Sequence, residues 1–226
     1  MFEIIPIYVV VLFTLTTFAT VWYMATATNR RISVLIVCGV WMVMQLIIGA
    51  SGFYLDTMVQ PPRFPALVLP PIILTIILFA TQRGRMFLDA LSLERLTLVH
   101  SCRIPVEIIL YLLFIAYAVP EEMTFEGRNL DILAGLTAPV VWYLVFKRGA
   151  SRRVLLVWNI LALCLVLNIV GVAILSLHTP FQQFGFTQPN IAVLHIPFVW
   201  LPGVIVPLVL LSHLAAIRQL LRKENS

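Results

Sequence analysis

Long apolar runs dominate this sequence and limit the folds that it can adopt. A helix needs about 20 mostly apolar residues to cross the hydrocarbon core of a bilayer. Seven such stretches follow one another with short joints between them, at residues 4–27, 32–55, 64–81, 96–119, 130–146, 154–177 and 191–215. We therefore expect an all-α, polytopic integral membrane protein, a bundle of seven transmembrane helices that forms one domain over residues 1–226.

The composition agrees with this expectation. Hydrophobic residues make up 61% of the 226 residues and charged residues only 11%, whereas soluble domains carry roughly 25% charged residues. Runs this long and uninterrupted favour helices over the alternating strands of a membrane barrel. We expect the first run to remain as an anchor, because it is too long for a signal peptide and Met1 to Glu3 carries no basic residue.

Basic residues gather at alternate joints. They follow the first, third, fifth and seventh runs, as Arg30, Arg31, Arg83, Arg85, Arg95, Lys147, Arg148, Arg152, Arg153, Arg218, Arg222 and Lys223. The opposite joints hold only Arg63 and Arg128, beside several acidic residues. The positive-inside rule then places the N-terminus outside and the C-terminus in the cytoplasm of a multi-pass cell (plasma or inner) membrane protein. This distribution explains the net charge of +5 without a nucleic-acid partner.

Ionisable side chains interrupt the fourth run on one face. His100, Arg103, Glu107 and Tyr111 are spaced by three, four and four residues, which places them on a single helical stripe. On insertion scales a central charge costs roughly 2.5–3.5 kcal/mol, while each large apolar residue returns only about 0.3–0.6 kcal/mol. We therefore expect other helices to cover this stripe.

Two interpretations of the stripe remain open. In the first, Arg103 and Glu107 form an ion pair at i,i+4 that only fixes helix packing. In the second, Glu107 holds a proton or a cation, and Arg103 is its counter-charge or an anion anchor. We favour the second, because a buried ion pair is an expensive way to pack two helices.

Polar residues of other runs are candidates to meet this stripe. Gln45 lies near the middle of the second run, Asp131 at the start of the fifth, and His195 in the outer half of the seventh. We include all three in the candidate ligand-binding site. His213 lies 18 residues beyond His195, a rise of about 27 Å in a helix. We expect it only to hydrogen-bond or to meet lipid headgroups.

Asn159 and Asn168 of the sixth run are half a turn apart in angle, so at most one of them can face a shared cavity. Interhelical hydrogen bonding is the simpler explanation of such buried amides.

The sequence predicts no metal site and names no cofactor. Cys38, Cys102 and Cys164 are far apart and lack ligand spacing, which argues against a disulfide framework or a zinc motif. A site made of His195, His178 and carboxylates lacks the close pairing of helical metal motifs. A retinal pigment is excluded as well, because the seventh run has no lysine for a Schiff base.

These observations favour binding over catalysis. The leading hypothesis is a protein that binds an ion or small polar solute in a buried polar cavity, for transport or sensing, with a proton-coupled step at Glu107. One alternative is an intramembrane enzyme that acts on a lipid or isoprenoid, with His100, His195 or Glu107 as acid or base. Another is a non-catalytic subunit that anchors a membrane-protein partner.

Overall fold

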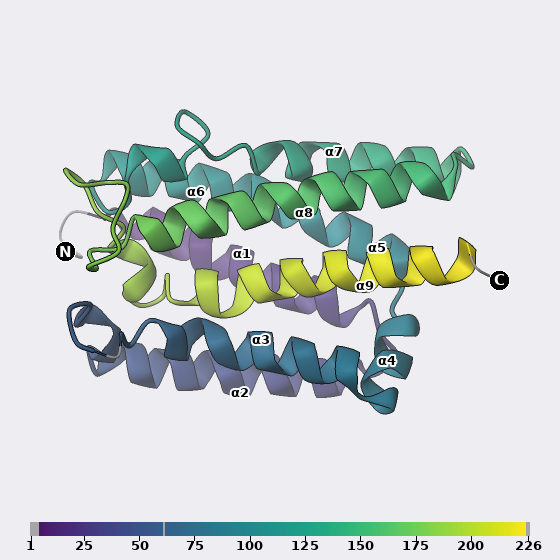
Figure 1. Cartoon of the computed structure of the whole chain (residues 1–226), viewed down its shortest axis with the longest axis horizontal. Helices are drawn as coiled ribbons and strands as arrows, with labels where there is room; N and C mark the ends of the chain where they lie inside the picture. Colours follow the sequence, from purple (N-terminus) through teal and green to yellow (C-terminus); the bar gives the residue numbers. More distant parts are fainter. Residues whose placement is uncertain (1–4, 61, 225–226) are drawn as a thin grey trace.

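A computed structural model describes residues 5–60 and 62–224. The first residue of the first predicted run, Ile4, lies outside this range. Within these ranges the regular structure is entirely helical, which confirms the predicted all-α class. The α-helices in Figure 1 are α1 (Ile7–Ala25), α2 (Arg31–Ala50), α3 (Pro65–Ala80), α4 (Gln82–Asp89), α5 (Leu93–Leu98), α6 (Arg103–Ile115), α7 (Ile132–Trp142), α8 (Arg152–Leu175) and α9 (Val206–Glu224).

Five helical segments of the described chain are long and apolar enough to cross a membrane. They are α1, α2, the continuous segment Leu93–Ile115 that contains α5 and α6, α8, and the final segment Leu201–Arg222. A sixth is added if α3 and α4 are taken as one span, and Ile132–Lys147, which contains α7, is a shorter apolar helix. Several apolar helices of this length are the signature of a membrane protein.

A sharp bend of 93° separates α3 from α4. Gly84 makes the bend possible, because a Cβ atom at this position would lie 2.4 Å from the carbonyl oxygen of Leu78. The hydroxyl of Thr81 accepts a hydrogen bond from the Gly84 N–H at 3.2 Å and caps α4. The carboxylate of Asp89 then binds the guanidinium of Arg218 through two contacts of 2.9 and 3.1 Å, which ties α4 to α9.

The fourth predicted run forms a helix that begins and ends earlier than expected. Its central turn, Val99–Cys102, is a tighter 3-10 helix between α5 and α6. Pro105 lacks the N–H that would bond the carbonyl of Ser101, and a 3-10 turn is a common response to a lost helical bond. The helix ends at Ile115 rather than residue 119, because Tyr117 adopts a positive φ of 57°.

The seventh predicted run, 191–215, is wrong at both ends. The regular helix begins only at Leu201, with a π-helical turn over Leu201–Ile205, and continues through α9 to Glu224. Pro197 and Pro202 explain the late start, because proline interrupts helical hydrogen bonding and restricts the residue before it. The indole N–H of Trp41 donates to the carbonyl of Gly203 at 2.8 Å, so α2 satisfies a backbone group of the irregular turn.

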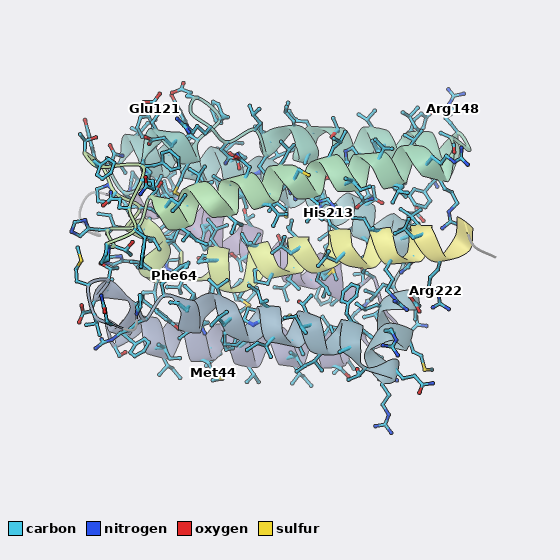
Figure 2. All side chains as sticks on the ribbon, in the orientation of Figure 1. Met44, Phe64, Glu121, Arg148, His213 and Arg222 are labelled. Carbon is cyan, nitrogen blue, oxygen red and sulfur yellow. The ribbon has the colours of Figure 1, made fainter. Side chains whose placement is uncertain are left out.

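The two ends of the bundle carry opposite charge. Figure 1 shows the N-terminal part and the connections α6–α7 and α8–α9 at one end, and the C-terminal part of α9 with α4 at the other. In Figure 2 Glu121 lies at the first end, whereas Arg148 and Arg222 lie at the second. We call these the acidic end and the basic end. This asymmetry agrees with the sequence, in which basic residues gather at alternate joints and acidic residues at the joints between them.

Candidate functional site

Buried polar side chains meet where α5 and α6 face α7, α8 and α9. We call this group the polar cluster, and its members are His100, Arg103, Glu107, Asn129, Asp131, Asn159 and His213. Every member is at most 6% exposed. His213, labelled in Figure 2, marks its position well inside the bundle. The prediction that neighbouring helices cover the polar stripe of the fourth run is therefore confirmed for His100, Arg103 and Glu107.

Arg103 is the hub of one half of the cluster. Its Nη1 lies 3.0 Å from Oδ1 of Asp131, the residue that precedes α7, and donates to the carbonyl of Ala162 in α8 at 3.3 Å. Its Nη2 lies 2.9 Å from Nε2 of His213 in α9. One guanidinium thus links three helices to α6. Such fork geometry suits arginine, which presents several donors in one plane.

These contacts fix the protonation of His213. Arginine can only donate, so Nε2 of His213 must accept and the ring is neutral with its proton on Nδ1. That Nδ1 lies 2.9 Å from Oδ1 of Asn159, which accepts the bond. The amide nitrogen of Asn159 in turn donates to the carbonyl of Leu155 at 2.9 Å. Both ring nitrogens of His213 and both terminal nitrogens of Arg103 therefore have partners, whereas Nε of Arg103 is buried without a hydrogen-bond partner among the described residues.

His100 packs against this half without hydrogen-bonding to it. Its ring stacks on the ring of His213, with centroids 3.8 Å apart and planes at 14°. Trp158 approaches from the edge at 5.5 Å. Both ring nitrogens are buried and lack a hydrogen-bond partner within the described part of the chain. Its contribution to the cluster is thus a shape and stacking contact.

Glu107 belongs to a second half with fewer donors. Both of its carboxyl oxygens lie near the same amide nitrogen, Nδ2 of Asn129, at 2.6 and 2.7 Å. This nitrogen also donates to the carbonyl of Met123 at 3.0 Å. The Oδ1 of Asn129 accepts from the backbone N–H of Asp131 at 3.0 Å, which orients the amide. A single side-chain amide therefore serves the whole carboxyl group.

The first interpretation of the stripe, a packing ion pair between Arg103 and Glu107, does not match the salt bridge that Arg103 makes. Both residues lie in the described part of the chain, and Arg103 pairs with Asp131 instead. The close approach of α7 explains the exchange, because Gly135 packs directly on the first turn of α6. A Cβ atom at Gly135 would lie 3.2 Å from Cβ of Arg103 and 3.0 Å from Cγ1 of Ile104.

The charges of the cluster do not cancel when both carboxyl groups are ionised. Arg103 contributes one positive charge and His213 is neutral, while Glu107 and Asp131 together contribute two negative charges. Burying an uncompensated charge is costly, so such a group takes up a proton or acquires a counter-ion. Because Asp131 is paired with the guanidinium of Arg103, the uncompensated negative charge lies on Glu107.

A narrow crevice of about 80 Å³ lies against this second half. Its polar lining consists of Arg103, Glu107, Asp131 and Asn190, and its other walls are apolar side chains of α3, α8 and the segment from Leu201 to Val209. We refer to it below as the crevice. Met123 and Asn190, from the connections at the acidic end, also line it.

Three predicted site residues lie away from the cluster and do not line the crevice. Tyr111 is half-buried and stacks on Phe125 with ring centroids 5.0 Å apart. His195 is half-buried, with Nδ1 3.0 Å from the carbonyl oxygen of Ile191. Gln45 is buried, and its Oε1 accepts from the hydroxyl of Tyr54 at 2.7 Å. The polar cluster therefore contains only some of the residues that the sequence predicted for the site.

His213 is the most important residue that the sequence misplaced. It was expected only to hydrogen-bond or to meet headgroups and was left out of the candidate site, yet its hydrogen bond is to Arg103 at the centre of the cluster. The angular argument for the sixth run is confirmed, because Asn159 is buried in the cluster while Asn168 is exposed and donates to the carbonyl of Arg128. Asn129 was missed because it lies in a joint without helical periodicity.

The described residues contain no group of three or more His, Cys, Asp and Glu side chains arranged to hold a metal ion. His178, considered above as a partner of His195, is exposed and lies 3.2 Å from Oε1 of Gln182. The polar cluster is instead built from ion pairs and amide contacts.

Fold and site together define a class, that of all-helical proteins with several apolar helices able to span a membrane and a buried ionic cluster between them. Within this class, the chain belongs to the family described as Domain of unknown function (DUF8737), which matches residues 64–221. All members of the polar cluster lie inside the matched range. No curated protein and no solved structure matches the chain.

Proposed function

We propose that this protein binds a proton or a small cation at Glu107 for transport or sensing. The proposal includes the finer topology expected from the sequence, namely seven spans in a cell membrane with the N-terminus outside. The excess of buried carboxyl groups over guanidinium groups is the observation that carries it. A proton or a cation would restore neutrality without displacing the Arg103–Asp131 pair.

The size of the crevice supports a small ligand. On the same measure a cavity of about 10–15 Å³ already holds one water molecule, so a space of about 80 Å³ has room for an ion with several waters. A sugar or an amino acid would need more room and more polar partners. Glu107 can receive such an ion, because its carboxyl oxygens share one amide donor.

The acidic end supports access from the outer side. The connections that supply Asn129 and Asn190 to the site lie at this end, where Glu121 also lies (Figure 2). Acidic residues attract cations and raise their local concentration. At the opposite end, the Asp89 pair with Arg218 ties α4 to α9.

Infrared difference spectroscopy tests the proposal directly. Purified protein in lipid nanodiscs would be titrated with Na⁺ and K⁺ at fixed pH, and then with protons at fixed salt. We expect a carboxyl band that changes on titration in the wild type and is lost in Glu107→Gln. The matched control is Glu126→Gln, because Glu126 is exposed at the acidic end.

Two results would overturn the proposal. One is an unchanged carboxyl response in a well-folded Glu107→Gln protein. The other is the absence of any cation or proton response in the wild type over the range in which the protein stays folded. A flux assay in proteoliposomes with a pH-sensitive dye then separates transport from sensing.

A further inference from the structure

The walls of the crevice differ in character from its polar floor. Half-buried or exposed apolar side chains form its rim, namely Phe64, Val170, Ala173, Ile174, Pro202 and Val206. Ile174 is 41% exposed on the side of α8. In a membrane-spanning bundle such a rim faces lipid chains rather than water. The crevice therefore connects the buried polar cluster sideways to the bilayer.

Asn190 gives the floor an unused acceptor. This residue is 1% exposed, and its amide nitrogen donates to the carbonyl of Ala173 at 3.1 Å. Its backbone N–H donates to the carbonyl of Ser176 at 2.8 Å. The remaining atom, Oδ1, is buried and has no hydrogen-bond partner among the described residues. A buried acceptor without a donor is unfavourable, so this atom points to a ligand that donates.

The charges on the floor restrict the ligand further. Glu107 and Asp131 repel an anionic headgroup, and both terminal nitrogens of Arg103 are already engaged, although its buried Nε has no hydrogen-bond partner among the described residues. A phosphate or fatty-acid carboxylate is therefore disfavoured, whereas a headgroup that donates hydrogen bonds is favoured. The narrow volume of about 80 Å³ admits one small head and the first carbons of one chain.

We propose that the crevice binds a single-chain amphiphile with a hydrogen-bond-donating head, of the class of long-chain alcohols and amines. The head donates to Oδ1 of Asn190 beside the polar cluster, and the chain passes Ala173 and Ile174 into the bilayer. The amphiphile head and the cation of the preceding proposal share the crevice but use different contacts, because the head uses the Asn190 acceptor and the chain uses the apolar walls, whereas the cation uses Glu107.

Photolabelling in nanodiscs tests this proposal. The probe is hexadecanol that carries a diazirine and an alkyne in its chain, and the matched comparison probe is the corresponding hexadecanoic acid. We expect the alcohol to label peptides of α8 and of the segment around Pro202, with competition by unlabelled hexadecanol. Equal labelling by the acid would overturn the proposal, and so would uniform labelling of exposed surfaces such as α2 without competition.

Matched variants locate the binding site. Ala173→Trp should fill the crevice and Asn190→Leu should remove the acceptor, each weakening competition by hexadecanol at least about tenfold. Their controls are Val157→Trp, at a 55% exposed position of the same helix, and Asn168→Leu, at an exposed amide. If either crevice variant fails to fold, Ile174→Trp at the exposed rim replaces it.

The outcomes separate this proposal from the cation proposal. Wild-type competition in a folded Ala173→Trp or Ile174→Trp protein would refute amphiphile binding in the crevice, whatever the infrared experiment shows. If hexadecanol labelling is saturable but the infrared band of Glu107 does not respond to cations or protons, the amphiphile proposal is supported and the cation proposal is refuted.

Discussion

The two halves of the polar cluster differ in their balance of donors and acceptors. Around Arg103 the two terminal nitrogens reach partners at Asp131, in α8 and in α9, and the ring of His213 is held in one tautomer, although Nε of Arg103 has no hydrogen-bond partner among the described residues. Around Glu107 one amide nitrogen serves both carboxyl oxygens, and Oδ1 of Asn190, which lines the same crevice, is buried without a donor among the described residues. The first half holds helices together, and we call it the clamp. The second half has acceptors that can bind a cation or a hydrogen-bond donor.

This difference separates stability from function within a single cluster. A buried ion pair that also links several helices stabilises one arrangement of them, and removing either ion leaves the other charge without a partner. A group with surplus acceptors contributes less to stability and has the capacity to bind. Substitutions in the Arg103 half should therefore mainly lower the free energy of unfolding, whereas substitutions in the Glu107 half should mainly weaken ligand binding.

Arg103→Leu should have the largest effect on stability. The variant leaves Asp131 buried without its cation and removes the donor to His213, and breaking a buried pair costs about 3–5 kcal/mol. Thermal unfolding in detergent should show a large fall in Tm or a failure to fold. Arg128→Leu, at an exposed position, is the control. The clamp interpretation fails if Arg103→Leu unfolds at the same temperature as the control.

Gly135→Val should be the next most damaging change. The added carbons would enter the contact between α7 and the first turn of α6, where even a Cβ atom would lie 3.2 Å from Cβ of Arg103. Overpacking of this kind costs about 1–3 kcal/mol. Gly39→Val, where a Cβ atom would meet nothing within 4 Å, is the matched control. Equal melting temperatures would show that this contact does not hold Asp131 against Arg103.

The sequence predicted the helical class and the burial of the polar stripe because both follow from local patterns. Twenty-residue apolar runs and a spacing of three or four residues are visible without any knowledge of packing. The same reasoning failed over residues 191–200, where Pro197 and Pro202 outweigh hydrophobicity. The last boundary also differs, since α9 continues past residue 215 to Glu224, and Arg218 in this extension contacts Asp89 of α4.

The partners of the stripe were harder to predict because they depend on how helices dock. Spacing brings Glu107 close to Arg103 along one helix, but the absence of a side chain at Gly135 brings Asp131 closer in space. Asn129 lies in an irregular connection and has no periodic signal. The contact between Arg103 and His213 at the centre of the cluster could not be predicted, because the two residues are far apart in the sequence.

His213→Leu should destabilise the protein less than Arg103→Leu. It removes one acceptor of the guanidinium, for a cost of about 1–3 kcal/mol, while the Asp131 pair survives. The wild-type ring should also show a proton on Nδ1 and none on Nε2 by ¹⁵N NMR of labelled histidine. A proton on Nε2 would contradict the clamp, because Arg103 could not then donate to this atom. His178, which is exposed, provides the reference signal.

Glu107→Gln should have the smallest effect on stability. The glutamine oxygen can still accept from Asn129, and the substitution removes a negative charge that lacks a cation of its own, so the change should stay within about 1 kcal/mol. Asp131→Asn is the matched comparison, because the same kind of substitution there removes the partner of Arg103 and should cost several times more. Chemical unfolding of both variants in the same detergent measures the difference. If they lose equal stability, Glu107 is as much a structural ion as Asp131, and the contrast between a clamp and a binding half disappears.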